Sequence, residues 1–154
     1  MTTPTTFDSL EALRGATGTH LGFTDWLDIT QERVDLFADA TGDHQWIHVD
    51  VARANAESPF GGPIAHGYLT LALSNLFLPQ LIAVPAASAG VNYGTGRVRF
   101  PAPVPVGSRV RGGAEIAAVE DIPGGLQTTI TITIEVEGGT KPACVIESLT
   151  RWLA

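Results

Sequence analysis

The chain has 154 residues and a formal net charge of −7, and 44% of its residues are hydrophobic. This length fits one domain spanning residues 1–154 with a core of its own, although the polar residues 1–6 are predicted to be loose. The acidic balance argues against a nucleic-acid-binding surface, because neutralising phosphates requires clustered basic side chains. The single cysteine excludes an internal disulfide framework.

The sequence carries no pattern typical of secretion or of insertion into a membrane. The first basic residue is Arg14, and no apolar stretch surrounds it. The apolar segment 76–90 is internal, and Pro79 and Gln80 interrupt it, so it fits neither a signal sequence nor a membrane span. We therefore predict a cytoplasmic protein that does not contact a membrane.

The first third of the chain predicts a strand followed by a short helix. Apolar residues across 20–29 indicate the strand, and Thr30 is a typical N-cap for a helix over 31–40. Gly42 lies where helices commonly end with a left-handed residue. We therefore predict that residues 43–48 form a loop, where functional side chains are often exposed.

Two further helices are predicted before the strand-rich half of the chain. Asp50 can cap a short helix over 51–56. After a connection rich in glycine and proline, residues 65–78 are apolar on nearly every side. A helix that is hydrophobic all round belongs in the centre of a fold.

The second half of the chain predicts long strands. Apolar and polar residues alternate over 126–136, which is typical of a strand with one buried face. The segments 91–100, 106–119 and 142–153 share this alternating, β-branched character. Long strands joined by short Gly-Gly turns favour an antiparallel sheet. We therefore predict an α+β protein whose sheet wraps around the apolar helix.

The predicted loop after the first helix contains a candidate acid–base pair. Asp43 precedes His48 by five residues, so a loop could bring the carboxylate and the imidazole to one small molecule such as water. Together they provide a hydrogen-bond acceptor and a group that titrates near neutral pH. The pattern is also compatible with structural roles, in which Asp43 caps the loop and His48 packs against its neighbours.

The glycine-rich segment 61–67 leads directly into the apolar helix. The first backbone N–H groups of a helix are unpaired and lie at the positive end of its dipole. Gly67 would let a substrate carbonyl approach these donors closely, as in an oxyanion hole. The alternative is a plain turn in which a backbone group satisfies His66.

Other chemistries have less support in the sequence. His44, His48 and Asp43 could chelate a metal, but no spacing typical of a zinc site is present, so we predict no metal. No phosphate-binding glycine loop, complete dinucleotide fingerprint or serine-hydrolase elbow is found.

Four arginines lie within fifteen positions of this otherwise acidic chain: Arg97, Arg99, Arg109 and Arg111. Such a cluster could bind the phosphates of a ligand or carrier. The alternative is a solvated strand face.

Three segments together resemble the hydratase motifs of MaoC-like dehydratases. They are GDHQWIHVD at 42–50, GPIAHG at 62–67 and VRFPAPV at 98–104. The similarity extends over roughly residues 20–152 and is greatest to the NodN-like and single-domain (R)-specific enoyl-CoA hydratase branch. It implies a hotdog fold, an antiparallel sheet wrapped around a long central helix, which usually pairs as a homodimer.

The resemblance also implies roles for individual residues. Asp43 and His48 would form the catalytic pair, and the backbone N–H of Gly67 would hold the thioester carbonyl. Where the family commonly has Asn-Pro between the aspartate and the histidine, this chain has Gln45 and Trp46, so a differently shaped substrate site is expected. The substrate-binding residues that we expect are Gln45, Trp46, His66, Arg97 and Arg99.

The activity implied is that of an (R)-specific enoyl-thioester hydratase. Such an enzyme reversibly hydrates trans-2-enoyl-CoA to (R)-3-hydroxyacyl-CoA in fatty-acid or related acyl-thioester metabolism. No cofactor is expected, and coenzyme A or an acyl carrier protein would be part of the substrate. Two alternatives stay open: a hotdog acyl-CoA thioesterase, and a non-catalytic subunit that binds acyl thioesters.

Overall fold

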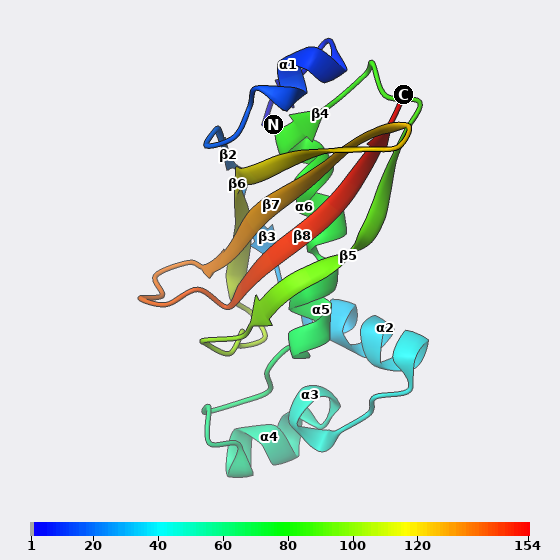
Figure 1. Cartoon of the computed structure of the whole chain (residues 1–154). Coiled ribbons are helices and arrows are strands. Elements are labelled where there is room, and N and C mark those ends of the chain that lie inside the picture. Colours follow the sequence, from blue (N-terminus) through cyan, green and yellow to red (C-terminus); the bar gives the residue numbers. More distant parts are fainter. Residues whose placement is uncertain (1) are drawn as a thin grey trace.

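A curved antiparallel sheet is the main layer of the protein (Figure 1). The computed structural model describes residues 2–154, and the strand order of the sheet is β2-β6-β7-β8-β5, with β3 also pairing with β6. The strands are β2 (His20–Phe23), β3 (Leu27–Asp28), β5 (Ala89–Arg99), β6 (Arg109–Ile122), β7 (Gly125–Val136) and β8 (Cys144–Leu153). All the pairings in this sheet are antiparallel, as predicted.

Strand β7 shows how the sheet forms an inner face. Leu126, Ile130 and Ile134 are fully buried, whereas Thr129 between them is only partly covered. This alternation confirms the predicted strand with one buried face. Cys144 at the start of β8 is also buried, and burial raises the pKa of its thiol to about 11, so it packs as a small apolar side chain.

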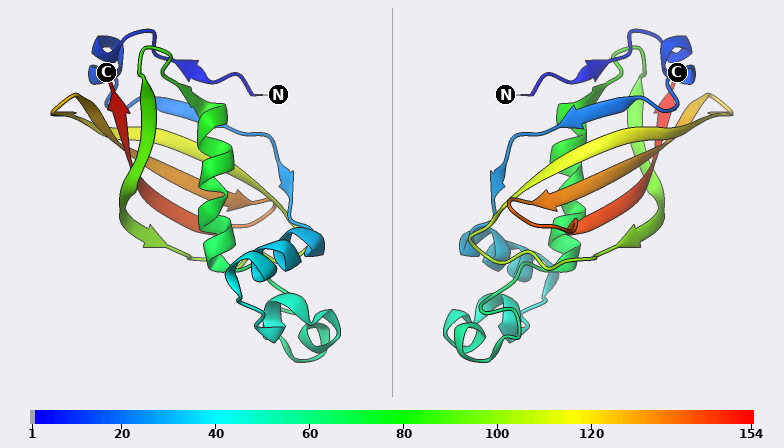
Figure 2. Two further views of the ribbon diagram at one scale, coloured as in Figure 1. Left: turned by 90° about the vertical axis from the view of Figure 1, so that its right-hand side faces the viewer. Right: turned by 90° about the vertical axis from the view of Figure 1, so that its left-hand side faces the viewer.

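A helix in two segments lies across the concave face of the sheet, as Figure 2 shows. These segments, α5 (Gly67–Ala72) and α6 (Ser74–Leu81), follow one another along the same line. One stripe of side chains at four-residue spacing is buried: Leu69, Leu73, Phe77 and Leu81. The sheet wrapped around this helix confirms the predicted α+β hotdog fold.

The outer side of this helix departs from the sequence prediction. Tyr68 and Leu76 are exposed in the single chain, so the helix is not covered on every side. Burial follows the stripe that faces the sheet, because the concave face can cover only one side of a helix.

Three helices form an extension at one end of the sheet, close to where α5 begins (Figure 1). They are α2 (Gln31–Thr41), α3 (Trp46–Val49) and α4 (Val51–Glu57). Thr30 caps α2, Gly42 ends it with a left-handed φ of 82°, and Asp50 caps α4, all as predicted. The predicted loop 43–48 is wrong in part, because Trp46 begins the single helical turn α3, on which His48 lies.

The N-terminal segment corrects two further predictions. Thr5 and Thr6 form the short strand β1 (Thr5–Thr6), which pairs in parallel with β4 (Ile82–Ala83), so these residues are not loose. Met1 lies outside the described residues. Helix α1 (Leu10–Arg14) follows. The single strand predicted over 20–29 is divided into β2 and β3, and between them the Thr24 hydroxyl accepts the N–H of Gly112 at 3.0 Å.

Among residues 2–154, no helix is both long and apolar enough to span a membrane.

The contact between the helix and the sheet depends on a glycine in β6. A Cβ built on Gly112 would lie 2.8 Å from the Cβ of Phe77, which is closer than nonbonded carbons approach. Phe77 is 1% exposed and is enclosed by the core. Gly112 therefore sets how closely the helix can approach the sheet.

Gly112→Ala should destabilise the protein, because the added methyl must displace Phe77 and the helix that carries it. Overpacking of this kind costs about 1–3 kcal/mol, which a thermal unfolding curve would report as a lower Tm. Gly15→Ala is the matched control, since the nearest atom to its Cβ would lie 3.9 Å away. A Gly112→Ala variant as stable as wild type would contradict this account of the packing.

Candidate functional site

Asp43 begins the connection between α2 and α3. The left-handed Gly42 turns the chain out of α2, and Asp43 Oδ1 then accepts the backbone N–H of Gln45 at 3.3 Å. The side chain of Asp43 is 53% exposed. A carboxylate is thus held by its own loop while part of it stays open to a ligand.

Two hydrogen bonds fix His48, one made by its ring and one by its backbone carbonyl. Its Nδ1 lies 2.6 Å from the carbonyl oxygen of Ile64, and its own carbonyl accepts the side-chain amide of Gln31 at 2.7 Å. Because the Ile64 carbonyl can only accept, Nδ1 carries the hydrogen, and Nε2 of the neutral ring keeps a free lone pair. This is the tautomer that a base requires.

Burial sets the charge of His48. The residue is 8% exposed, and this desolvation lowers its pKa below the usual 6.5. The hydrogen bond to Ile64 opposes the shift, and the neighbouring His66 adds to it. His48 is therefore mainly neutral at pH 7.

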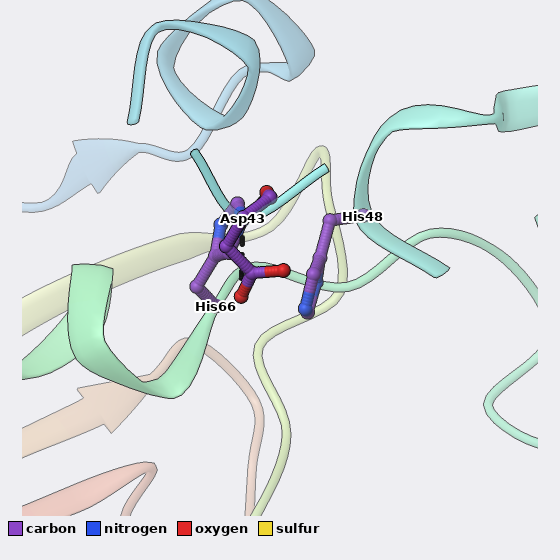
Figure 3. Close-up of side chains that lie close together, drawn as sticks. All are labelled: Asp43, His48 and His66. Atoms are coloured by element: carbon purple, nitrogen blue, oxygen red, sulfur yellow. Dashed lines mark hydrogen bonds and ion pairs between the residues drawn. The ribbon is translucent and has the colours of Figure 1, made fainter. Parts of the chain in front are cut away.

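His66 completes the cluster from the residue just before α5. Its Nε2 lies 2.9 Å from the backbone oxygen of Asp43, and its ring stacks on His48 with centroids 3.9 Å apart. Figure 3 shows the three side chains together, contributed by three separate segments. One nitrogen or oxygen atom from each side chain lies within 4.8 Å of those from the other two.

This spacing suits a shared water molecule. Two hydrogen bonds of about 2.8 Å to one water span roughly this distance, so Asp43 and His48 could hold a water between them. The same atoms are of the types that bind metals, but His48 Nδ1 and His66 Nε2 each already donate to a carbonyl. His44, which the sequence suggests as a third ligand, bonds to Asp39 instead. The absence of a metal stays a prediction.

Gly67 is the first residue of α5 and follows the cluster directly. The segment before it is pinned by two backbone bonds, from Ile64 N–H to the Ile47 carbonyl and from Ala65 N–H to the Val104 carbonyl. A Cβ on Gly67 would lie 3.4 Å from the ring of Phe100. On the side of Gly67 where a Cβ would lie, the structure therefore places Phe100 and not the open space predicted for a substrate.

Two cavities flank the start of α5. The larger, about 580 Å³, lies between the helix and strands β5 and β8, with Tyr68, Leu78 and Trp152 among its lining residues. The smaller, about 370 Å³, includes Gly67 and Phe100 in its wall. Either cavity could receive part of an elongated ligand whose reactive centre lies at the cluster.

The predicted substrate-binding residues lie in three different settings. Gln45 is exposed beside Asp43, and Trp46 is half-buried with the guanidinium of Arg53 4.3 Å above its ring. Arg97 and Arg99 are exposed on β5. His66 is only 3% exposed, which leaves little of its ring for a substrate.

The other two arginines of the cluster in the sequence have acidic partners. Arg109 pairs with Glu137, which directly follows β7, and Arg111 pairs with Glu135 on β7. The four arginines therefore do not form one free basic surface.

Two residues at the site carry no signal in the sequence. Ile64 contributes only its carbonyl oxygen, and Gln31 only an amide that ties α2 to α3. A polar residue in the first turn of a helix is common, and a backbone acceptor leaves no mark on residue type. Neither role could be predicted without the fold.

The comparisons with known proteins identify the family of this chain. The sequence model of the family described as "MaoC like domain" matches residues 13–138. The chain belongs to this family. It is 55% identical to 3-hydroxyacyl-thioester dehydratase Z of Mycobacterium tuberculosis over 150 residues, which cover 97% of this chain and 99% of that protein. It is also 43% identical to nodulation protein N of Rhizobium leguminosarum bv. viciae, over 92% of this chain and 89% of the relative.

Solved structures share the fold. The (R)-hydratase from A. caviae involved in PHA biosynthesis superimposes with a TM-score of 0.73 at 25% identity, covering 88% of this chain and 96% of that one. The hotdog arrangement predicted from the motifs is therefore the arrangement of known relatives.

The histidines at the site should titrate in a defined order. Burial lowers the pKa of His48, whereas the hydrogen bond that His44 donates to Asp39 raises the pKa of the exposed His44. NMR titration of the imidazole signals should therefore give a midpoint below 6.5 for His48 and above 6.5 for His44. The reverse order would contradict the described burial and hydrogen bonding.

The same shift predicts a direction for stability. The unfolded chain binds a proton at His48 more readily than the folded chain does. The contribution of His48 to the free energy of unfolding is therefore fully present above pH 6.5. It is lost as the pH falls through the lowered pKa.

Proposed function

We propose that this protein catalyses the reversible hydration of a trans-2-enoyl thioester to the (R)-3-hydroxyacyl thioester. The observation that carries the proposal is the pairing of Asp43 with His48, whose polar atoms lie close enough to share one water beside the N-terminus of α5. The 55% identical relative is named as a 3-hydroxyacyl-thioester dehydratase, an enzyme of the reverse reaction.

The proton transfers follow from the tautomer of His48. The free Nε2 lone pair and the Asp43 carboxylate accept the two hydrogens of the water. As the water oxygen bonds to C3, one of its O–H bonds breaks and that proton passes to the pair. The electrons of the C2–C3 double bond move toward the thioester oxygen, and the pair then returns the proton to C2. The enoyl thioester and water combine without net oxidation or reduction, so no redox cofactor is needed.

The start of α5 supplies the electrostatic part of the mechanism. Negative charge grows on the thioester oxygen as the water adds, and the Gly67 N–H is the donor that binds this oxygen. As the first residue of the helix, Gly67 has no acceptor for its N–H within α5. Removing such a donor typically costs about 3–4 kcal/mol of transition-state stabilisation.

The substrate is an acyl chain attached to coenzyme A or to an acyl carrier protein. The cavity lined by Tyr68, Leu78 and Trp152 runs along the helix from the residue after Gly67, and we assign the acyl chain to it. Arg97 and Arg99 are the exposed cations on β5 that remain available for phosphate groups of the carrier. The reaction takes place in the cytoplasm.

The active form is a homodimer. Strand β5 ends the sheet, and its exposed edge includes Val91 and Tyr93, which are 44% and 54% exposed. An open edge of this length is covered in most proteins, and pairing with a second copy about a two-fold axis covers both edges at once. Light scattering should give twice the 16.2 kDa chain mass, and a mass of one chain at micromolar concentration would contradict the dimer.

Crotonyl-CoA separates this proposal from the alternatives. A hydratase removes the enoyl absorbance without releasing thiol, a thioesterase releases free thiol, and a binding subunit does neither. Asp43→Asn and His48→Ala should each lower the hydration rate by about 10²-fold or more, because each removes a group that transfers a proton.

The matched control for these variants is His44→Ala. His44 lies in the same loop but bonds to Asp39 and does not join the cluster, so this variant should hydrate crotonyl-CoA at nearly the wild-type rate. A folded Asp43→Asn or His48→Ala protein with unchanged turnover would remove that residue from the mechanism.

A further inference from the structure

His66 contacts both members of the catalytic pair, although the mechanism above assigns it no step. It lies on the segment that leads into α5, stacks on His48 and bonds to the backbone of Asp43. Its ring also contacts Phe37 of α2, with centroids 4.9 Å apart. At 3% exposure its ring is almost fully enclosed.

The hydrogen bond of His66 is directed at the backbone of Asp43 and not at its carboxylate. Nε2 lies 2.9 Å from the Asp43 carbonyl oxygen but 3.9 Å from Oδ2, which is beyond hydrogen-bonding distance. The bond therefore fixes where Asp43 lies, and it leaves Oδ2 of the carboxylate available to a ligand while Oδ1 accepts the Gln45 N–H.

The other ring nitrogen of His66 argues against a purely structural role. Since Nε2 donates to a carbonyl, Nδ1 carries the lone pair of the neutral ring, and it is buried with no hydrogen-bond partner among residues 2–154. An unpartnered buried polar atom is costly and uncommon. A phenylalanine would stack without this cost and an asparagine could donate, whereas histidine combines a small flat ring with a ring N–H.

We propose that His66 is a positioning residue that holds Asp43 and His48 at the spacing needed to share one water. This inference rests on the hydration proposed above. The donor function sets the position of Asp43, and the stacking sets the orientation of the His48 ring. Small misplacements of catalytic groups can cost as much as about 10²-fold in rate, so a residue that touches both groups has a large effect without touching the substrate.

The stacking has an electrostatic consequence as well. Two protonated imidazole rings 3.9 Å apart would repel, so a proton on His66 disfavours a proton on His48. The other groups that act on His48 are the Asp43 carboxylate and the Ile64 carbonyl, which both favour the proton. Removing the His66 imidazole therefore favours protonated His48. The acid limb of the kcat/KM profile should then move to higher pH.

Two substitutions separate the two contacts of His66. His66→Phe keeps a ring for stacking and removes the donor, whereas His66→Gln keeps a donor and removes the stacked ring. Both should raise the midpoint of the acid limb of kcat/KM for crotonyl-CoA hydration. Both should lower kcat by about tenfold or more with a smaller change in KM, and His66→Gln should retain more activity if its amide reaches the Asp43 carbonyl.

A matched control variant and a check of folding accompany the two His66 variants. His44→Gln is the same substitution at an exposed histidine outside the cluster, and it should change neither kcat nor the acid limb. Circular dichroism restricts the comparison to folded variants. If both folded His66 variants keep kcat within twofold and an unmoved acid limb, the positioning role is wrong and His66 is only a packed side chain.

A second readout does not depend on activity at all. The NMR titration midpoint of His48 should rise in the folded His66 variants relative to wild type. If wild type fails to hydrate crotonyl-CoA, the proposed function fails, yet this midpoint still tests the contact. An unchanged midpoint in both variants would overturn the coupling between the two rings.

Discussion

The seating of the α5–α6 helix in the concave sheet is the constraint on which the rest of the molecule depends. The buried stripe that includes Leu69 and Phe77 fixes the rotation of this helix, and Gly112 allows it to lie close to β6. The position of the helix in turn determines where α5 begins, and therefore where His66 and Gly67 lie. The site is thus placed by packing that is some distance from the chemistry.

Around that starting point, the site is assembled by side chains that bind backbone carbonyls. His48 donates to the Ile64 carbonyl, His66 to the Asp43 carbonyl and Gln31 to the His48 carbonyl. Each of these bonds joins two segments that are distant in the sequence. The pattern leaves the His48 Nε2 and the Asp43 Oδ2 available to water, because backbone groups supply the partners of the other polar atoms.

The sequence alone predicts the parts of this structure that depend on local physics. The caps at Thr30 and Asp50, the left-handed Gly42 and the alternating strand β7 follow from residue type and period. The roles of Asp43, His48 and Gly67 came from motif resemblance, because spacing alone is equally compatible with structural roles.

What the sequence misses depends on contacts between distant segments. The helical turn that carries His48 is too short to show a period, and the pairing of Thr5 and Thr6 depends on where Ile82 and Ala83 lie after the central helix. The stacking of His66 on His48 joins residues eighteen positions apart and has no local signature.

A double-mutant cycle tests the central claim that Asp43 and His48 act as a unit on one water. If they do, the variant carrying both Asp43→Asn and His48→Ala should hydrate crotonyl-CoA no more slowly than the slower single variant. Losses that multiply in the double variant would show two independent roles and contradict the account.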